Sequence, residues 1–292
     1  MANVRQIRRR IRSVQNTAKI TNALQLVAAS KMRRAQTRAE AARPYAQRLR
    51  YVLGNLSAQT GSGEDGAGPA HPLLQQREGD RTLIVAVTPN RGLSGGLPGN
   101  LNRRAGAFAL EQTGPVSVVA VGKKGLEFFS RLRYTVAAQF TEMGDYPTSA
   151  ETLPVARIAM DEFIEDRVDR VYLVYPEFVN TGVQRPTVRQ LLPVQPPEME
   201  QEAGREVEYI YEPSPVAVLE EILPRYVEMQ VYEAVLENAA SQQAAQMVAM
   251  KNATDAARDM VQSLTLAMNK ARQEQITREL LDLIGGVAAL EG

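Results

Sequence analysis

Apolar residues recur every three or four positions along the first fifty residues of the chain. The stripe is formed by Val4, Ile7, Ile11, Val14, Ala18, Leu24, Val27, Ala28 and Met32. This spacing puts the side chains on one face of a helix. No Gly or Pro interrupts residues 1–43, and the apolar period continues beyond Pro44. We therefore expect one long helix over residues 1–57.

A second stripe near the carboxyl end has a stricter period. Its positions alternate in steps of four and three: Leu236, Ala240, Gln243, Met247, Met250, Thr254, Ala257, Val261, Leu264, Met268 and Ala271. Such alternation is typical of a coiled-coil seam. Only Pro224 lies inside the segment that follows Pro215. We expect a helix within residues 213–292, paired antiparallel with the first helix.

Between the two long segments the period shortens, and short β-branched runs alternate with short helical patterns. We expect strands at 82–88, 116–121, 134–140 and 171–175, edge strands at 186–192 and 207–211, and helices at 101–112, 123–132 and 155–166. This alternation predicts a largely parallel sheet. The fold class is therefore α/β, a long antiparallel two-helix coiled coil plus a central Rossmann-like α/β domain over residues 81–212. Residues 58–80, which hold five Gly and two Pro, are expected to form a flexible linker.

The composition excludes several classes of chemistry. The chain has 292 residues, 44% of them hydrophobic and 23% charged, as in a folded protein. It contains no Cys and a single His, His71. Disulfides, thiolate metal sites, Cys nucleophiles and His-based triads are thereby excluded or strongly disfavoured. No run reaches the roughly 18–20 apolar residues that a membrane span requires.

Positive charge is concentrated at the amino end. Residues 1–50 hold 13 of the 34 basic residues and one of the 33 acidic residues, Glu40, so they carry a net charge of +12 and the remainder carries −11. Such asymmetry indicates an acidic partner surface. A solvated helix face, a nucleic-acid-binding surface and a transit peptide within residues 1–20 are the alternatives. No helix-turn-helix, zinc or RNA-binding signature accompanies the charge.

A Gly-rich turn, residues 91–99, follows the first predicted strand, where a nucleotide-binding loop would lie. Its sequence, RGLSGGLPG, matches neither GxxxxGK[ST] nor GxGxxG. It offers no Lys for phosphates and no following hydroxyl for Mg²⁺. We expect a structural turn, with no catalytic, cofactor or metal site in the chain.

Long motifs at both ends and in the middle resemble one known family. They are RQIRRRIRSVQNTAKIT (5–21), VAASKM (27–32), TPNRGLSGG (88–96), ENAAS (237–241), MVAMKNATD (247–255) and NKARQEQITRELLDLIGG (269–286). In these motifs the chain is similar to the γ subunit of the F-type ATP synthase, and the similarity extends over essentially the whole sequence.

The resemblance implies a rotor without a catalytic site of its own. In that family the paired helices turn inside a ring of α and β subunits, the α/β domain contacts the ε subunit and the membrane c-ring, and ATP forms on β. Carried over by motif, Lys31, Arg33 and Arg34 are expected to face acidic lever loops of β. Four residues higher on the shaft are expected to meet the loops that grip it: Arg272, Gln273, Thr277 and Glu279.

The family motif begins at the fifth residue, which leaves no room for a cleavable transit peptide before it. We therefore expect a bacterial protein, held peripherally at the cytoplasmic side of the cell inner membrane. The expected partners are the α, β and ε subunits and the c-ring, with no nucleic acid and no direct membrane insertion. A basic coiled-coil adaptor or nucleic-acid-binding protein remains the alternative.

Overall fold

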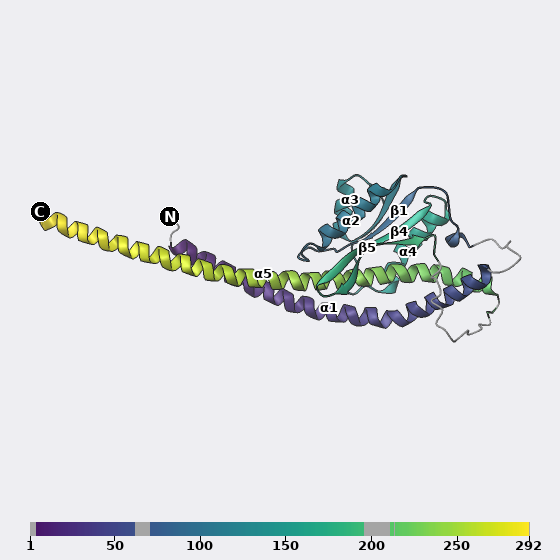
Figure 1. Ribbon diagram of the computed structural model, residues 1–292, viewed down its shortest axis with the longest axis horizontal. Coiled ribbons are helices and arrows are strands. Elements are labelled where there is room, and N and C mark those ends of the chain that lie inside the picture. Colours follow the sequence, from purple (N-terminus) through teal and green to yellow (C-terminus); the bar gives the residue numbers. More distant parts are fainter. Residues whose placement is uncertain (1–3, 62–70, 196–210, 213, 292) are drawn as a thin grey trace. The chain divides into compact units, whose positions relative to one another are not determined.

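The computed structural model describes residues 4–61, 71–195, 211, 212 and 214–291. Its helices are α1 (Val4–Gly61), α2 (Leu97–Glu111), α3 (Lys123–Arg131), α4 (Ser149–Ile164) and α5 (Pro215–Glu291), with a 3₁₀ helix η1 (Pro72–Leu74). Its strands are β1 (Thr82–Val87), β2 (Val116–Val121), β3 (Thr135–Phe140), β4 (Arg170–Asn180) and β5 (Val183–Leu192). The expected combination of two long helices and a central sheet is confirmed (Figure 1).

The chain forms two compact units, and both long helices contribute to each. The first unit consists of Met1–Ala28 and Gln246–Gly292, and the second of Ala29–Ala245. These units cut across the predicted division into 1–57, 58–80, 81–212 and 213–292, which remains a prediction. Part of the predicted linker, 62–70, and most of the predicted strand at 207–211 lie outside the described residues.

In the first unit, α1 and α5 meet along the predicted seam. Met250, Thr254 and Ala257 are buried, and the later seam positions from Val261 to Ala271 are half-buried between exposed neighbours. A polar pair interrupts the apolar contact, because the hydroxyls of Thr21 and Thr254 are 2.7 Å apart and buried. Thr254 also donates to the Met250 carbonyl at 2.8 Å, so the hydroxyl pair is satisfied within the two helices.

In the second unit, a five-stranded sheet has the order β3-β2-β1-β4-β5. The first four strands are parallel and β5 pairs antiparallel with β4. β1 is buried at all six positions, as a central parallel strand should be. α2 and α3 cover one face, while α4 and segments of α1 and α5 cover the other (Figure 1).

An ion pair of 2.7 Å between Arg50 of α1 and Glu233 of α5 joins the two long helices here. Since residue 21 meets 254 and residue 50 meets 233, the helices run antiparallel.

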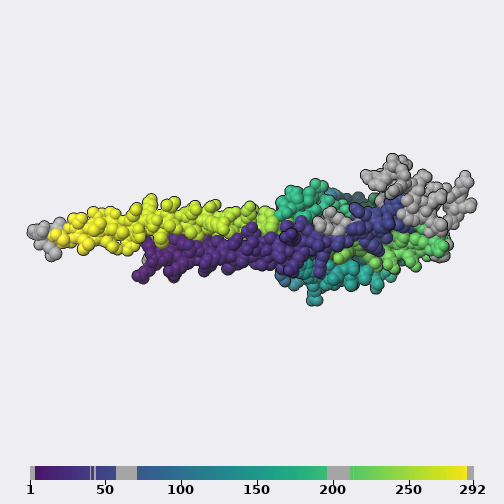
Figure 2. Space-filling view, turned by 90° about the horizontal axis from the view of Figure 1, so that it is seen from below, coloured from purple at the N-terminus to yellow at the C-terminus, as the bar shows by residue number. Residues whose placement is uncertain are grey.

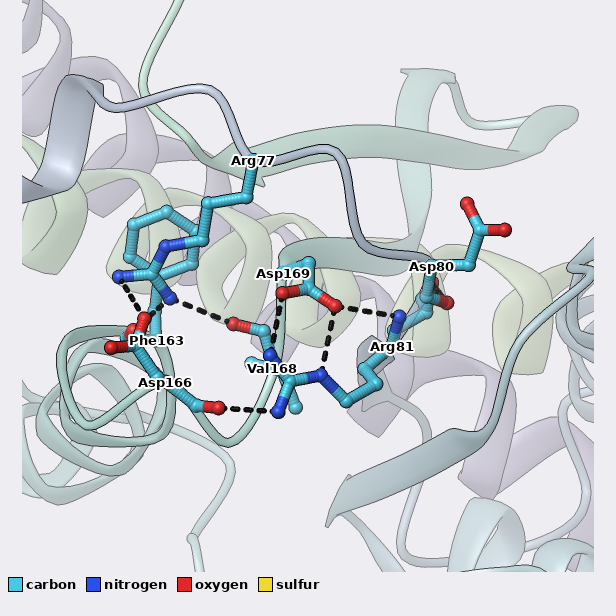
Figure 3. A network of polar contacts seen from close by, with 8 residues as sticks. Arg77, Asp80, Arg81, Phe163, Asp166, Val168 and Asp169 are labelled. Carbon is cyan, nitrogen blue, oxygen red and sulfur yellow. Dashed lines mark hydrogen bonds and ion pairs between the residues drawn. The ribbon is translucent and has the colours of Figure 1, made fainter.

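An ionic cluster fastens the segment before β1 to the turn between α4 and β4 (Figure 3). Arg81 binds both oxygens of Asp169, with Nε–Oδ2 at 2.9 Å and Nη2–Oδ1 at 2.8 Å. Arg77 pairs with Asp166 at 2.9 Å and lies over the Phe163 ring at 4.2 Å. The hydrogen bonds from Arg81 hold the pKa of the buried Asp169 carboxyl below its usual range. The start of β1 is thus fixed against the strand that lies beside it.

Candidate functional site: the junction of the long helices with the sheet

Three polar side chains of α5 bind the carboxyl end of the sheet, and we call Glu237, Asn238 and Ser241 the α5 anchor. Glu237 Oε2 accepts a hydrogen bond from the Phe178 amide at 3.2 Å. Asn238 Nδ2 donates to the Thr88 carbonyl at 3.3 Å, and Ser241 Oγ donates to the Pro176 carbonyl at 3.0 Å. Asn238 and Ser241 are buried. One turn of α5 is therefore attached to two neighbouring strands.

The α5 anchor occupies a particular place in the α/β topology. From β1 the chain moves to β2 and β3 on one side, and later to β4 on the other. Ligands of open α/β sheets bind at such a reversal, outside the carboxyl ends of the strands. Thr88 and Pro176 each lie two residues beyond Ala86 and Val174, which pair across β1 and β4. The chain thus places its own helix where a bound ligand would lie in other α/β proteins.

The amino end of α3 is also occupied by the chain itself. The Gly125 amide donates to Thr88 Oγ1 at 2.8 Å, the Lys123 amide to Asn90 Oδ1 at 3.0 Å, and the Lys124 amide to the Pro89 carbonyl at 3.2 Å. These are the amides that a phosphate would use at a helix amino terminus. The Gly-rich turn at 91–99 leads into α2, with Leu93 and Gly95 at φ 67° and 58°.

Several titratable groups lie around the α5 anchor. Burial raises the pKa of the Glu237 carboxyl, and the Phe178 amide and Arg189 act in the opposite direction. Burial also raises the pKa of Tyr175 to about 12, so its phenol is neutral at physiological pH. The junction is held by neutral hydrogen bonds and one partly buried carboxylate.

The predicted contact residues of α1 have different surroundings. Lys31 is half-buried, and its ammonium lies 2.6 Å from Asp145 of the segment between β3 and α4. Arg33 and Arg34 are exposed on α1. In the second unit α1 lies on the outside of the molecule, and its outer side chains are accessible (Figure 2).

The four predicted contacts on α5 all lie in the first unit and are exposed: Arg272, Gln273, Thr277 and Glu279. Glu279 accepts a hydrogen bond from Gln275 at 2.9 Å. The three predicted residues of α1 belong to the second unit. The structure therefore describes two separate groups of surface residues. The role of the α5 anchor was missed from the sequence, although Glu, Asn and Ser next to apolar seam positions were a visible signal.

Removing the α5 anchor is expected to loosen α5 from the sheet. A triple variant with Glu237→Ala, Asn238→Ala and Ser241→Ala loses three hydrogen bonds, each contributing about 1 kcal/mol. We expect the free energy of unfolding, measured with urea, to fall by about 3 kcal/mol. Gln242→Ala on the same turn is the matched control and should change it by less than about 0.5 kcal/mol. A triple variant as stable as the control would contradict this account of the junction.

The described part of the chain contains neither a cluster of metal-binding side chains nor a membrane-spanning helix. Within it, no group of three or more His, Asp or Glu side chains is placed to hold a metal ion. Among the helices of the described residues, none has an apolar stretch of the length that a membrane span needs.

Comparison with known proteins identifies the class of protein to which the chain belongs. A family model described as ATP synthase matches residues 3–290, which makes the chain an ATP synthase subunit. The ATP synthase gamma chain of Dehalococcoides mccartyi strain CBDB1 is 50% identical over 290 residues, covering 99% of this chain and all of the relative. That of Chloroflexus aurantiacus strain J-10-fl is 47% identical over 294 residues, covering 99% of each. The chain belongs to the family of ATP synthase gamma chains.

A solved structure shows the same fold. It is from the Euglena gracilis mitochondrial ATP synthase, described as OSCP/F1/c-ring in rotational state 3. The similarity has a TM-score of 0.66 at 19% identity and covers 98% of this chain and 94% of the other.

Proposed function

We propose that this chain is the central rotor shaft of a bacterial F-type ATP synthase, coupling proton flow through a membrane ring to ATP synthesis on catalytic β subunits. The observation that carries the proposal is the full-length match to bacterial gamma chains. The geometry supports it, because two antiparallel helices form a long seam and one of them is anchored on a sheet. The shaft acts by contact and has no reaction centre of its own.

The proposed partners are the α and β subunits around the shaft, and the ε subunit and c-ring at the α/β domain. The chain would be peripheral, on the cytoplasmic side of the inner membrane. The bacterial origin of its relatives supports this location.

The proposed contacts with the lever loops of β are Lys31, Arg33 and Arg34. The proposed contacts with the loops that grip the upper shaft are Arg272, Gln273, Thr277 and Glu279. Exposure of the two arginines and of the four α5 residues supports these assignments. Exposed ion pairs contribute only about 0–1 kcal/mol each, so a turning shaft can leave one acidic loop for the next without a deep energy minimum. Each β subunit would then be shifted among its states by differential contact with the shaft.

Reconstitution tests the proposal. The purified chain should assemble with α and β subunits into a complex whose ATP hydrolysis exceeds that of the mixture lacking this chain. The chain alone should show no ATP turnover. Failure to assemble, together with tight and salt-sensitive binding to DNA, would favour the nucleic-acid-binding alternative.

A further inference from the structure

The segment between β3 and α4, residues 141–148, connects the sheet to helix α1, and we call it the β3–α4 loop. Two of its side chains bind α1 directly. Asp145 Oδ2 lies 2.6 Å from Lys31 Nζ. The Tyr146 ring lies under the guanidinium of Arg38, 4.9 Å from its centre. Lys31 and Arg38 are seven residues apart, close to two turns, so both side chains lie on the same side of α1.

The other contacts of the β3–α4 loop lead into the α/β domain. Asn90, which follows β1, donates through Nδ2 to the Met143 carbonyl at 3.0 Å. Thr148 and Glu151 form a capping box at the start of α4. The loop is therefore held firmly on the side of the sheet.

A cavity of about 370 Å³ lies beside the loop and is bordered by α5. The loop, the ends of β1, β2 and β3, and one face of α5 around Asn238 and Gln242 line it. Met143 of the loop packs against the core that α5 shares with the sheet. The loop binds α1 itself through two polar contacts, with Lys31 and with Arg38.

Helix α1 has a second, apolar attachment further along. Leu49, Leu53 and Leu56 are buried in the same core as the sheet. Lys31 lies 18 residues before Leu49, about 27 Å along a helix. The turns between them are themselves packed, since Ala35 and Ala46 are buried. Two attachments at this separation add resistance to rotation of α1 about its axis relative to the sheet.

We propose that the β3–α4 loop fastens α1 to the α/β domain through Lys31–Asp145 and Arg38–Tyr146, and that this fastening carries part of the torque during rotation. The inference rests on the proposed function for its mechanical part. Asp145 and Tyr146 are positioning residues, which act by holding the shaft helix. Lys31 and Asp145 are each about 30% exposed, so the pair can open more readily than the buried α5 anchor.

A charge exchange in the assembled complex tests the proposal. Lys31→Glu and Asp145→Lys each place like charges across the contact, and the double variant restores an opposite pair. We expect each single variant to lower proton-driven ATP synthesis in vesicles about two- to fivefold, as loss of one partly exposed ion pair allows. The double variant should recover more than half of the lost rate. Arg103→Glu, an exposed cation on α2, is the control for net charge and should leave the rate unchanged.

Two further measurements separate this role from others. ATP hydrolysis by the complex detached from the membrane, where the shaft turns without load, should stay unchanged in Asp145→Lys and in Arg103→Glu, which alter no residue of the proposed contact with β. Amide hydrogen exchange in residues 141–148 of the isolated chain should rise in both single variants and return to the wild-type value in the double variant. Asp145→Glu, which keeps the charge, should behave as wild type.

The proposal is overturned if the single variants synthesise ATP at the wild-type rate, or if the double variant is as impaired as Lys31→Glu. The second result would assign Lys31 to the acidic loops of β alone. If the wild-type chain does not assemble with α and β, the proposed function fails and the torque-bearing role fails with it. The hydrogen-exchange measurement then still decides whether the loop is fastened to α1.

Discussion

Replacing both Arg33 and Arg34 by Glu is expected to reduce proton-driven ATP synthesis about tenfold or more, while the chain stays folded. Both side chains are exposed, and neither forms an ion pair with another described residue. If the proposed contact is correct, the reversal converts two attractions to an acidic loop of β into two repulsions, and like charges facing each other in an interface are strongly unfavourable. ATP synthesis by the reconstituted complex measures the effect.

Two control variants test whether the reversed charge at positions 33 and 34 causes the loss of ATP synthesis. Arg33→Lys with Arg34→Lys keeps both charges and should retain most of the rate, because an exposed ion pair needs no bidentate geometry. Arg103→Glu with Arg157→Glu makes the same change of net charge on exposed positions of the α/β domain and should have little effect. Thermal unfolding of the Arg33 and Arg34 variant should match that of wild type. If this variant makes ATP at the wild-type rate, the assignment of Arg33 and Arg34 to the proposed contact with β is wrong.

Gly122→Ala is expected to lower the free energy of unfolding by at least about 3 kcal/mol, because it combines backbone strain with a steric conflict. Gly122 has φ 104°, which L-residues rarely adopt. A methyl group there would lie 2.0 Å from the Thr88 carbonyl oxygen and 2.8 Å from Thr88 Oγ1. The same Thr88 accepts the hydrogen bond from Asn238, so the damage would reach the α5 anchor. The melting temperature, followed by circular dichroism, should fall by roughly 10 °C.

A glycine in open space provides the matched control. Gly99 lies inside α2, and a methyl group there would meet no atom within 4 Å. Gly99→Ala should therefore stabilise the chain by up to about 1 kcal/mol, since Ala is the better helix former. Equal melting temperatures for the two variants would show that Gly122 is not under steric constraint.

The sequence predicted the long helices well because their periodic pattern is repeated many times. Every predicted seam position from Leu236 to Ala271 is buried or half-buried. Boundaries were less accurate. α4 begins at Ser149 rather than 155, because the Thr148–Glu151 capping box starts the helix before Pro154. β4 continues past Pro176 to Asn180, because β5 pairs with it there.

The junction could be predicted only in part. The motif at 237–241 was visible, and polar side chains beside a buried seam require partners. Which partners they find depends on the sheet, since Ser241 and Pro176 are 65 residues apart in the chain. Lys31 and Asp145 are 114 residues apart and half-exposed, and nothing in the local pattern links them. Long-range polar pairing of this kind follows from the topology and not from periodicity.

The paired hydroxyls of Thr21 and Thr254 have a consequence for how the two helices store elastic strain. Sliding one helix by a heptad would break the hydrogen bond between these hydroxyls, at about 1 kcal/mol, although each keeps a carbonyl partner in its own helix, Ala18 or Met250. The helices can therefore bend together under load, but they resist sliding along one another. Deformation introduced at one end is then returned when the load is released, where a slipping pair would dissipate it as heat.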